Sequence, residues 1–278
     1  MKRVLILLAA AALAVCACQQ QPRLVILHTN DTHSHFEPIR GSQYDGLGGV
    51  TERAAFVDSV RATYGPDRVL LLHAGDFSQG TSYFSELEGS MEPKIIDDLG
   101  YDCVTLGNHE FDNGIEALTA RLKAVTSGTR FLCANLDLSP FELGEVVKPY
   151  AILERGGMKI GVIGLESDVS TNVSKAIADR LQRLDDIEVT NRWADYLHDE
   201  EKCDMIILLS HAGYDKDQVI VPATRWVDLV VGGHTHTFVD GLLYVENARG
   251  KQVPIITDGC WGVEMGEIKV RRTPSSAR

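Results

Sequence analysis

The sequence predicts an α/β fold in one continuous domain, with strands and helices alternating along the chain. Short apolar runs recur between stretches with helical spacing, and several are unbroken, which is typical of strands covered on both faces. A further observation is that five of these runs end directly in Asp, His or Asn. Open α/β sheets bind ligands at the carboxyl ends of their strands, so these polar residues indicate one shared edge.

The N-terminal half alternates strands with helices. Helix 50–64 has apolar residues at helical spacing on one side, which places Glu52, Arg53 and Asp58 mostly on the outside. The loop 31–49 is rich in Gly, Ser, His and Pro, and we expect it at the mouth of a site. The predicted elements are strand 24–29, helix 50–64, strand 68–73, a helix from the region 85–91 that 93–99 extends, strand 101–106, helix 114–125 and strand 131–136.

The C-terminal half predicts mainly strands after a loop-like stretch at 140–147. Gly156 and Gly157 supply the turn of a β-hairpin. The predicted elements are hairpin strands 150–154 and 158–165, helix 190–200, strands 205–209 and 227–231, and closing strands 242–246, 253–257 and 263–270. The tail 273–278 is predicted to lack order.

The first residues predict an export signal and not a part of the fold. Lys2 and Arg3 precede an apolar segment of signal-peptide length, too short for a comfortable membrane span. The segment ends in a pattern that resembles a bacterial lipoprotein signal, with Cys18 as the lipid anchor; an ordinary cleaved secretory signal is the alternative. We expect a leader 1–18, a polar tether 19–23 and a domain 24–272, in the bacterial cell envelope, periplasmic or surface-exposed, with the lipid anchor as its only membrane contact.

Composition bounds the partners. The 278 residues carry a formal net charge of −12, which argues against binding to a nucleic-acid polymer. An acidic protein also repels anionic substrates unless bound cations reverse the local field. Four cysteines follow the leader; an exported chain permits disulfides, but we expect them mostly to be buried small apolar residues: Cys103, Cys133, Cys203 and Cys260.

One loop concentrates chemical groups. The segment Gly107-Asn-His-Glu-Phe-Asp112 lies between a predicted strand and a predicted helix. Asn108 offers a neutral oxygen to a metal, His109 offers a donor to an oxyanion, and Asp112 is spaced to hold the other ring nitrogen of His109. The alternative is a turn in which Asn108 and Asp112 only cap the helix.

Similar groups end four other runs, and their order along the chain is distinctive. The stretches are Asn30-Asp31-Thr32-His33, Ala74-Gly75-Asp76, Ser210-His211 and Gly232-Gly233-His234-Thr235-His236. Together with the 107–112 segment they resemble the calcineurin-like metallophosphoesterases, and in particular the 5′-nucleotidase branch. The resemblance covers nearly all of the chain after the leader. It implies a four-layer sandwich of two mixed β-sheets flanked by helices.

The resemblance also implies two divalent metal ions and their ligands. Asp31, His33 and His236 would hold the first ion, Asn108, His211 and His234 the second, and Asp76 would bridge them. These nitrogen and oxygen donors suit zinc or manganese, with cobalt and iron as alternatives. His109 would contact the substrate phosphoryl group with Asn108, while Asp112 orients His109.

Each ligand has a structural alternative when taken alone. His211 could be a hydrogen-bonded core histidine, Asp31 an Asx-turn residue, and the 233–236 stretch a plain loop.

His28, His35 and His73 have no ligand position, and we expect them behind the ligands or at the mouth of the site. His198 is expected only to be solvated. The three tryptophans are expected to pack, with Trp261 the least certain of them.

The implied activity is hydrolysis of phosphomonoesters, most simply 5′-nucleotides, by a metal-bridging hydroxide. Family 5′-nucleotidases usually carry a second, C-terminal domain that grips the nucleoside, and this sequence stops before it. A separate chain could supply that domain, or the domain present could act alone as a less selective phosphatase. A phosphodiesterase acting on cyclic nucleotides or nucleotide sugars is a further candidate, as is a non-enzymatic envelope protein with an inactive metal site.

Overall fold

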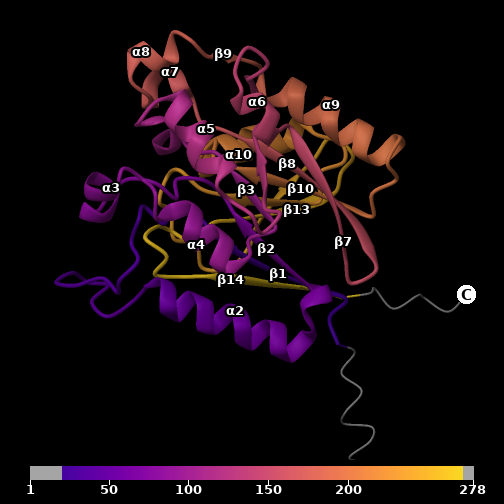
Figure 1. Ribbon diagram of the computed structural model, residues 1–278. Coiled ribbons are helices and arrows are strands. Elements are labelled where there is room, and N and C mark those ends of the chain that lie inside the picture. The colour runs from indigo at the N-terminus through magenta and orange to yellow at the C-terminus, as the bar shows by residue number, and fades with distance from the viewer. Residues whose placement is uncertain (1–20, 272–278) are drawn as a thin grey trace, which may run out of the picture.

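The computed structural model describes residues 21–271, and two six-stranded mixed sheets packed face to face form its centre (Figure 1). The expected sandwich of two mixed sheets flanked by helices is confirmed. The first sheet has the order β14-β1-β2-β3-β4-β6, and its strands are β1 (Leu24–Thr29), β2 (Val69–His73), β3 (Cys103–Thr105), β4 (Arg130–Leu132), β6 (Val147–Lys148) and β14 (Gly266–Val270). The leader with Cys18, the first two residues of the tether (19 and 20), the last residue of the expected domain (272) and the tail 273–278 lie outside the described residues.

The second sheet has the order β12-β13-β11-β10-β8-β7. Its strands are β7 (Tyr150–Arg155), β8 (Met158–Leu165), β10 (Met205–Ser210), β11 (Leu229–Gly232), β12 (Leu243–Glu246) and β13 (Gln252–Ile256). A further two-stranded sheet pairs β5 (Leu136–Asp137) with β9 (Gln182–Arg183). The strands that carry the sequence motifs run parallel to one another within each sheet, β1 to β3 in the first and β10 with β11 in the second, whereas β14 pairs antiparallel with β1.

Helices cover the outer face of each sheet. In Figure 1, α2 lies beneath the first sheet and α9 lies on the far side of the second. The helices are α2 (Val50–Tyr64), α3 (Ser82–Leu87), α4 (Glu92–Leu99), α5 (Ile115–Lys123), α6 (Leu143–Val146), α7 (Val169–Asn172), α8 (Lys175–Ala178), α9 (Asp186–Asp199) and α10 (Tyr214–Ile220), with 3₁₀ turns at Pro66–Arg68, Asn108–Phe111 and Val221–Ala223.

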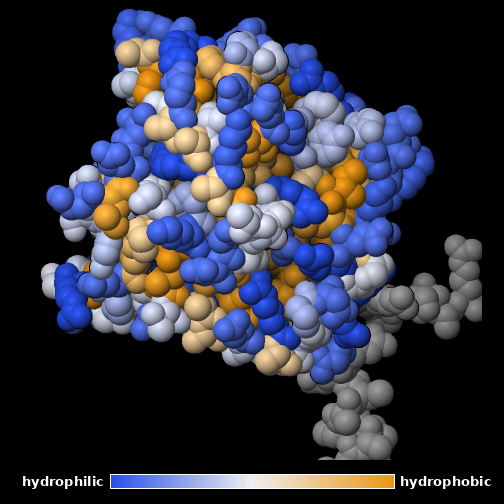
Figure 2. Space-filling model, viewed as in Figure 1, coloured by the Kyte–Doolittle hydropathy of each residue, from blue (hydrophilic) through white to orange (hydrophobic). Residues whose placement is uncertain are grey.

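The unbroken apolar runs follow from this layering. In β1, Leu24 and Ile26 point into the core between the two sheets, whereas Val25 and Leu27 join the core beneath the helices. Successive side chains of a strand face opposite sides, so a strand in a middle layer must be apolar at every position. On the outer face shown in Figure 2, by contrast, hydrophobic residues are interspersed with hydrophilic ones.

The two ends of the described chain meet at one edge of the first sheet. The backbone N–H of Arg23 donates to the carbonyl of Val270 at 2.8 Å. This edge holds the amino ends of β1 and β2, so it lies opposite the edge that carries the motifs. Within residues 21–271, no helix combines the length and apolarity needed to cross a bilayer.

Several predicted elements are correct and several are wrong. β1, α2 and the β7–β8 hairpin agree with the sequence, but the helix predicted across 85–99 is two helices. The chain breaks at Glu88 and Gly89, which both adopt left-handed backbone with φ of 52° and 75°. The strand predicted at 131–136 is likewise two short strands, β4 and β5, in different sheets.

Three further corrections concern polar residues and loops. Arg53 is buried, not on the outside of α2, and its guanidinium donates to the carbonyl of His35 at 3.3 Å. The stretch 140–147 is not all loop, because it contains α6. α9 begins at Asp186, earlier than predicted, since the Asp185 side chain accepts from the backbone N–H groups of Ile187 and Glu188.

Candidate metal centre

The five motifs meet at one edge of the sandwich, where the carboxyl ends of the parallel strands in both sheets face each other. Asp31 and His33 follow β1, Asp76 follows β2, and Asn108 and His109 follow β3. From the second sheet, His211 follows β10, and His234 and His236 follow β11. All the residues expected to bind metal are therefore brought together, although their strands belong to two sheets.

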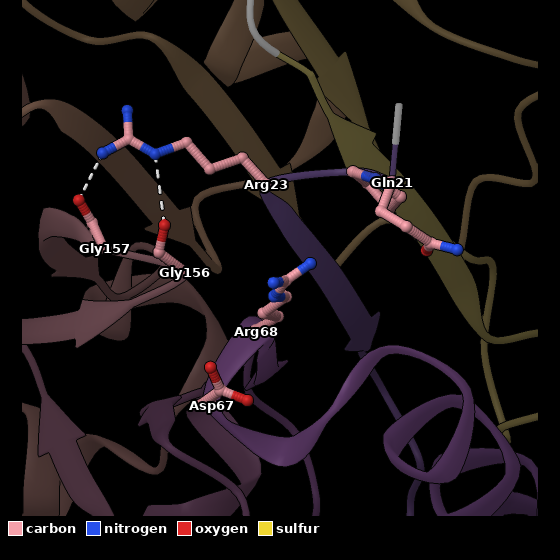
Figure 3. Close-up of a pocket in the computed structure, with 7 residues that line it drawn as sticks. Gln21, Arg23, Asp67, Arg68, Gly156 and Gly157 are labelled. Atoms are coloured by element: carbon pink, nitrogen blue, oxygen red, sulfur yellow. Dashed lines mark hydrogen bonds between the residues drawn. The ribbon is translucent and has the colours of Figure 1, made fainter. Parts of the chain in front are cut away.

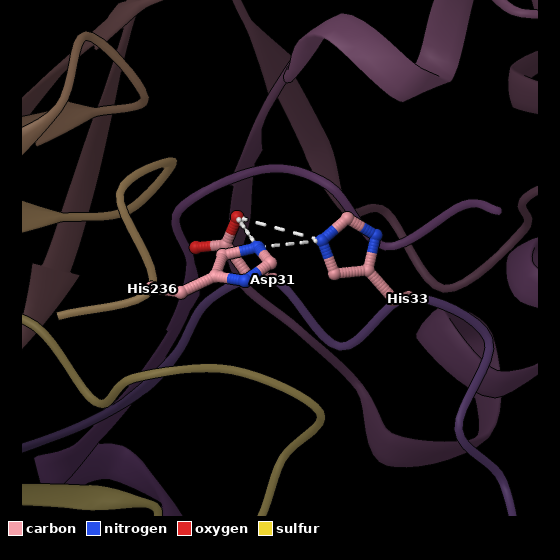
Figure 4. A group of neighbouring side chains, drawn as sticks. All are labelled: Asp31, His33 and His236. Carbon is pink, nitrogen blue, oxygen red and sulfur yellow. Dashed lines mark hydrogen bonds and ion pairs between the residues drawn. The ribbon is translucent and has the colours of Figure 1, made fainter. Parts of the chain in front are cut away.

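The first group of side chains joins the two sheets (Figure 4). The Nε2 atoms of His33 and His236 are 2.9 Å apart, and Oδ1 of Asp31 lies 3.4 Å from Nε2 of His236 and 3.8 Å from Nε2 of His33. Three donor atoms that converge in this way from separate loops could hold one cation.

A second group of side chains lies next to the first, and Asp76 contacts both. Asp76 Oδ2 lies 3.1 Å from Nε2 of His211 and 3.8 Å from Nε2 of His33. His234 completes a cluster with Asp76 and His211 in which all donor atoms lie within 4.8 Å of one another. Asp76 thus lies between the two groups, where a carboxylate that serves two cations would have to be.

Asn108 lines the same pocket and is buried. The hydroxyl of Ser167 donates to its Oδ1 at 3.4 Å, which holds the amide in place. Ser167 follows β8, so the second sheet also fixes the orientation of this loop of the first sheet.

The backbone of the centre is strained where the proposed donors sit. Asp31, His33, Asp76, His234 and His236 all have positive φ, between 47° and 76°. A non-glycine residue in this conformation costs on the order of 1–3 kcal/mol, and such residues concentrate at functional sites. Five such residues around one centre therefore indicate that the fold places their side chains there at the expense of local backbone energy.

Glycines in the motifs allow the loops to approach closely. A Cβ on Gly107 would lie 2.3 Å from Oδ1 of Asp76, and a Cβ on Gly75 would lie 2.6 Å from Nδ1 of His211. Gly233 is as crowded, because its Cβ would lie 2.6 Å from the carbonyl oxygen of Ala74. The glycines that precede Asp76, Asn108 and His234 are thus required by packing between loops.

Backbone carbonyls set the tautomers of two imidazoles. Nδ1 of His211 donates to the carbonyl of Ala74 at 2.7 Å, and Nδ1 of His33 donates to that of Ser78 at 3.2 Å. Each ring therefore directs Nε2 into the centre, an arrangement that is common for metal-binding histidines.

The donor set fits a cation. Among the described residues, Asp31 Oδ1 and His211 Nε2 are buried without a well-aligned hydrogen bond, and both point at the shared space. Burying such groups unpaired is costly, whereas a metal ion would satisfy them. Burial lowers the pKa of His234 to about 4, so its imidazole is neutral and free to donate a lone pair at neutral pH.

In the second group, His211 and Asp76 each favour the charged form of the other. Burial would lower the pKa of His211, but the carboxylates of Asp76 and Asp31 raise it well above its ordinary value. Burial also opposes ionisation of Asp76, yet the neighbouring His211 keeps the pKa of that carboxyl well below its ordinary value. Asp76 is consequently a carboxylate under physiological conditions, as a bridging ligand must be.

His109 and Asp112 form a pair at the rim of the pocket. Nδ1 of His109 lies 2.8 Å from Oδ2 of Asp112, and both side chains are 31% exposed. The hydrogen bond to Asp112 raises the pKa of His109. The backbone N–H of His109 also donates to Oδ1 of Asp76 at 3.0 Å, which ties the pair to the centre of the site.

Sequence reasoning missed two residues that shape the centre. Glu110 is fully buried, and its carboxylate accepts from the backbone N–H groups of Asp76, Ser78 and Gly107 at 2.9, 3.0 and 2.6 Å. Asn30 donates to Asp31 Oδ2 at 2.7 Å and to the carbonyl of Gly259. Both residues lie inside the motifs at 30–33 and 107–112, and this is the only feature of the sequence that could have indicated their role.

The remaining histidines differ in their surroundings. His28 lies 2.6 Å from Asp258, and His73, whose pKa burial lowers to about 3, contacts Thr32 at 3.0 Å, so both are behind the ligands. His35 lines the pocket with Trp261. The expectation that His198 is only solvated is wrong, since its ring stacks on Trp226 with centroids 3.3 Å apart.

The pocket over the centre has a volume of about 570 Å³. A pocket of about 640 Å³ lies at the opposite edge, where Arg23 donates to the carbonyls of Gly156 and Gly157 (Figure 3). Its lining residues include arginines and one aspartate but no imidazole. Pocket size alone therefore does not identify the chemical site, and the convergence of donors does.

Comparisons with known proteins agree with this geometry. The family model described as calcineurin-like phosphoesterase matches residues 24–238. Snake venom 5′-nucleotidase from Gloydius brevicauda is 33% identical over 283 residues, which cover 94% of this chain and 47% of that protein.

Two solved structures are similar over most of the chain. A 5′-nucleotidase precursor from Thermus thermophilus has a TM-score of 0.79 and 32% identity, covering 88% of this chain and 50% of the other. The NAD nucleotidase of Haemophilus influenzae has a TM-score of 0.77 and 30% identity, covering 88% and 46%. The chain spans about half the length of the curated relatives it matches.

Proposed function

Because the chain belongs to the calcineurin-like phosphoesterases and resembles the metallophosphatase part of 5′-nucleotidases, we propose that it hydrolyses phosphate monoesters, 5′-nucleotides among them. The observation that carries the proposal is the position of Asp76 between two clusters of donors, Asp31–His33–His236 and His211–His234. Asn108 is proposed to complete the second cluster.

The family uses two divalent metal ions, and we propose zinc or manganese for this chain, with cobalt and iron as alternatives. Bound in these clusters, two such ions would neutralise phosphoryl oxygens and make a water molecule acidic enough to act as a nucleophile. The protein itself supplies imidazoles fixed by hydrogen bonds, buried carboxylates and a pocket above them.

His109 is proposed to donate a hydrogen bond to the phosphoryl group or to the leaving oxygen, and Asn108 to contact the same group. Asp112 holds Nδ1 of His109, so the Nε2 edge of the ring is left for the substrate. A donor aimed at developing negative charge acts mainly in the transition state, and it therefore raises turnover more than it tightens binding.

The substrate and its recognition are proposals, since the relatives are about twice as long. A separate chain that supplies a nucleoside-binding domain would make this protein one half of a split nucleotidase. The similarity to a protein named NAD nucleotidase supports a second candidate, cleavage of a dinucleotide or another phosphodiester.

We further propose that the protein is lipid-anchored through Cys18 in a bacterial cell envelope, on the strength of its leader sequence. Metabolic labelling with a radioactive fatty acid tests this proposal. Label in the wild type and none in Cys18→Ala is the expected result, and equal labelling would contradict it.

The activity is tested on protein purified without residues 1–18. Metal analysis should find two divalent ions per chain, and AMP and 4-nitrophenyl phosphate should be hydrolysed. A chelator should abolish turnover, and zinc or manganese should restore it.

A chain that binds two metals and hydrolyses neither monoester would refute the proposal. Faster cleavage of NAD or bis(4-nitrophenyl) phosphate than of the monoesters would favour the diesterase. Co-purification from the source cell tests for a partner chain.

A further inference from the structure

Four rings form a continuous aromatic wall beside the metal centre. Trp261 stacks on His35 with centroids 5.4 Å apart, and Tyr44 meets the edge of Trp261 at 6.1 Å and stacks on Phe238 at 5.3 Å. His35 and Trp261 line the pocket that contains His33, Asp76 and the other candidate ligands. We call the set His35, Tyr44, Phe238 and Trp261 the aromatic wall.

Trp261 has an unfavourable backbone conformation. Its φ is +61°, and Gly259 and Gly262, with φ of 65° and 62°, flank it in the same tight segment. For a bulky residue this conformation is a genuine outlier, with a cost of order 1–3 kcal/mol. The backbone N–H of Trp261 donates to the carbonyl of Asp31 at 2.6 Å, and this hydrogen bond helps to offset the strain and keeps Trp261 beside a candidate metal ligand.

The partner ring is fixed to the same loop. Nδ1 of His35 donates to the carbonyl of His33 at 2.8 Å, and the buried Arg53 donates to the carbonyl of His35. The side chains of His35 and Trp261 are both partly exposed. His35 and Trp261 are thus fixed by hydrogen bonds and open to the pocket, and Tyr44 and Phe238 continue the aromatic wall from Trp261.

The rest of the lining indicates what could rest against this wall. No lysine or arginine occurs among the described residues that line the pocket, and Gln79, Thr171 and Asn172 provide neutral polar groups. A second anionic group on the substrate would find no lysine or arginine here. An uncharged ring system would instead find aromatic faces, which stack on nucleobases and aryl groups irrespective of their identity.

We propose that the aromatic wall binds the aromatic ring of the leaving group, a nucleobase or an aryl ring, of the phosphate monoester whose hydrolysis is proposed above. The inference rests on that function and specifies its substrate class. The metallophosphatase domain would then itself contribute to the selection of aromatic phosphate esters.

Two measurements test the proposal. The first compares kcat/KM for AMP with that for ribose 5-phosphate, which lacks only the base. The second measures binding of adenosine, which has the base but no phosphate, by calorimetry, and does not depend on turnover. The variants are Trp261→Leu, Trp261→Phe, which keeps a ring, and Trp226→Leu, a matched control whose indole lies outside this pocket against His198.

The wild type should prefer AMP by about tenfold, the scale of one stacked base. Trp261→Leu should reduce the AMP to ribose 5-phosphate ratio about tenfold and weaken adenosine binding, Trp261→Phe should keep most of both, and Trp226→Leu should change neither. The ratio is independent of how much of a variant folds. A wild-type ratio near one, or adenosine binding that Trp261→Leu leaves unchanged, would overturn the inference.

The two proposals fail in different ways. If neither ester is hydrolysed with both metals bound, the proposed function is wrong, and adenosine binding by the wild type but not by Trp261→Leu still supports the aromatic wall. If both esters are hydrolysed equally well, the function stands and the aromatic wall has no role in selecting the substrate.

Discussion

The Nε2 atoms of His33 and His236 lie 2.9 Å apart, although 203 positions separate the two residues and their strands belong to different sheets. Hydrogen bonding to Asp31 raises the pKa of His236 to about 10, while burial lowers the pKa of His33. Two imidazolium rings at this distance would repel each other, so the pair accommodates at most one proton or one shared cation. The contact exists only because the two sheets end at the same edge.

Replacing the carboxylate between the clusters should remove metal. We expect Asp76→Ala to bind clearly less metal than the wild type, because both clusters lose a donor and His211 loses its counter-charge. Metal content measured by mass spectrometry after gel filtration checks this, with the exposed Asp58→Ala as the control. Unchanged stoichiometry in Asp76→Ala would rule out a bridging role.

His109→Ala should separate catalysis from metal binding. We expect turnover of AMP to fall about 10²–10³-fold, the effect of losing one oxyanion donor, with metal content near that of the wild type. The reason is that Asp112 holds Nδ1 of His109 and that the proposed ligand sets omit His109, although one of its ring nitrogens also lies within 4.8 Å of donor atoms of His33 and Asp76. Steady-state kinetics and metal analysis on the same preparation decide the matter, and wild-type turnover in this variant would contradict the role.

A single methyl group at Gly107 should disrupt the centre. The new Cβ would lie 2.3 Å from Oδ1 and 2.5 Å from the backbone nitrogen of Asp76, and neither atom can move without shifting the loop. We expect Gly107→Ala to lose most of its metal. In Gly128→Ala the added methyl meets no atom within 4 Å, so metal binding should be kept. Equal metal content in the two variants would show that the loops are looser than their packing indicates.

Asn135 should be important for stability. It is fully buried, its amide donates to the Glu166 carbonyl at 2.7 Å and to Asp186 at 2.8 Å, and its oxygen accepts from the Glu166 N–H at 2.8 Å. Asn135→Ala leaves these groups unpaired, so the free energy of unfolding should fall by about 2–4 kcal/mol. Urea denaturation measures the change, and a loss below about 0.5 kcal/mol would mean that water replaces the amide.

The stabilising effect of Asp97 should depend on pH. Burial slightly opposes its ionisation, but hydrogen bonds from Ser127 and Thr126 outweigh this and lower the pKa of Asp97 to about 2 from its ordinary 3.8. A carboxyl with a lowered pKa stabilises the fold fully above its ordinary pKa, and this contribution is lost as the pH falls toward the folded value. The wild type should therefore be more stable than Asp97→Ala at pH 7, and the difference in free energy of unfolding should shrink between pH 4 and pH 2. A difference that does not change with pH would exclude this mechanism.

Local patterns were enough for most of the long strands and for the identity of the chemical residues, but not for 131–136, which is two strands in different sheets. The run Leu24–Leu27 of β1 is apolar at every position because both of its faces are covered, and His33, in the polar stretch after the strand, lines the site. Patterns failed where a local break or a distant contact intervened. The turn at Glu88 splits a helix that periodicity joins, and burial of Arg53 depends on its hydrogen bond to His35 in another segment.

By itself, the sequence determined the alternation of strands and helices and the set of donors at the ends of five strands, because these depend on residue order over short distances. Only the tertiary structure decided that His211 and His236, from one sheet, reach Asp76 and Asp31, from the other, and that Trp261 turns its ring toward the same pocket. Those distances follow from how two sheets stack and how their loops pack, and no local pattern of residues encodes that packing.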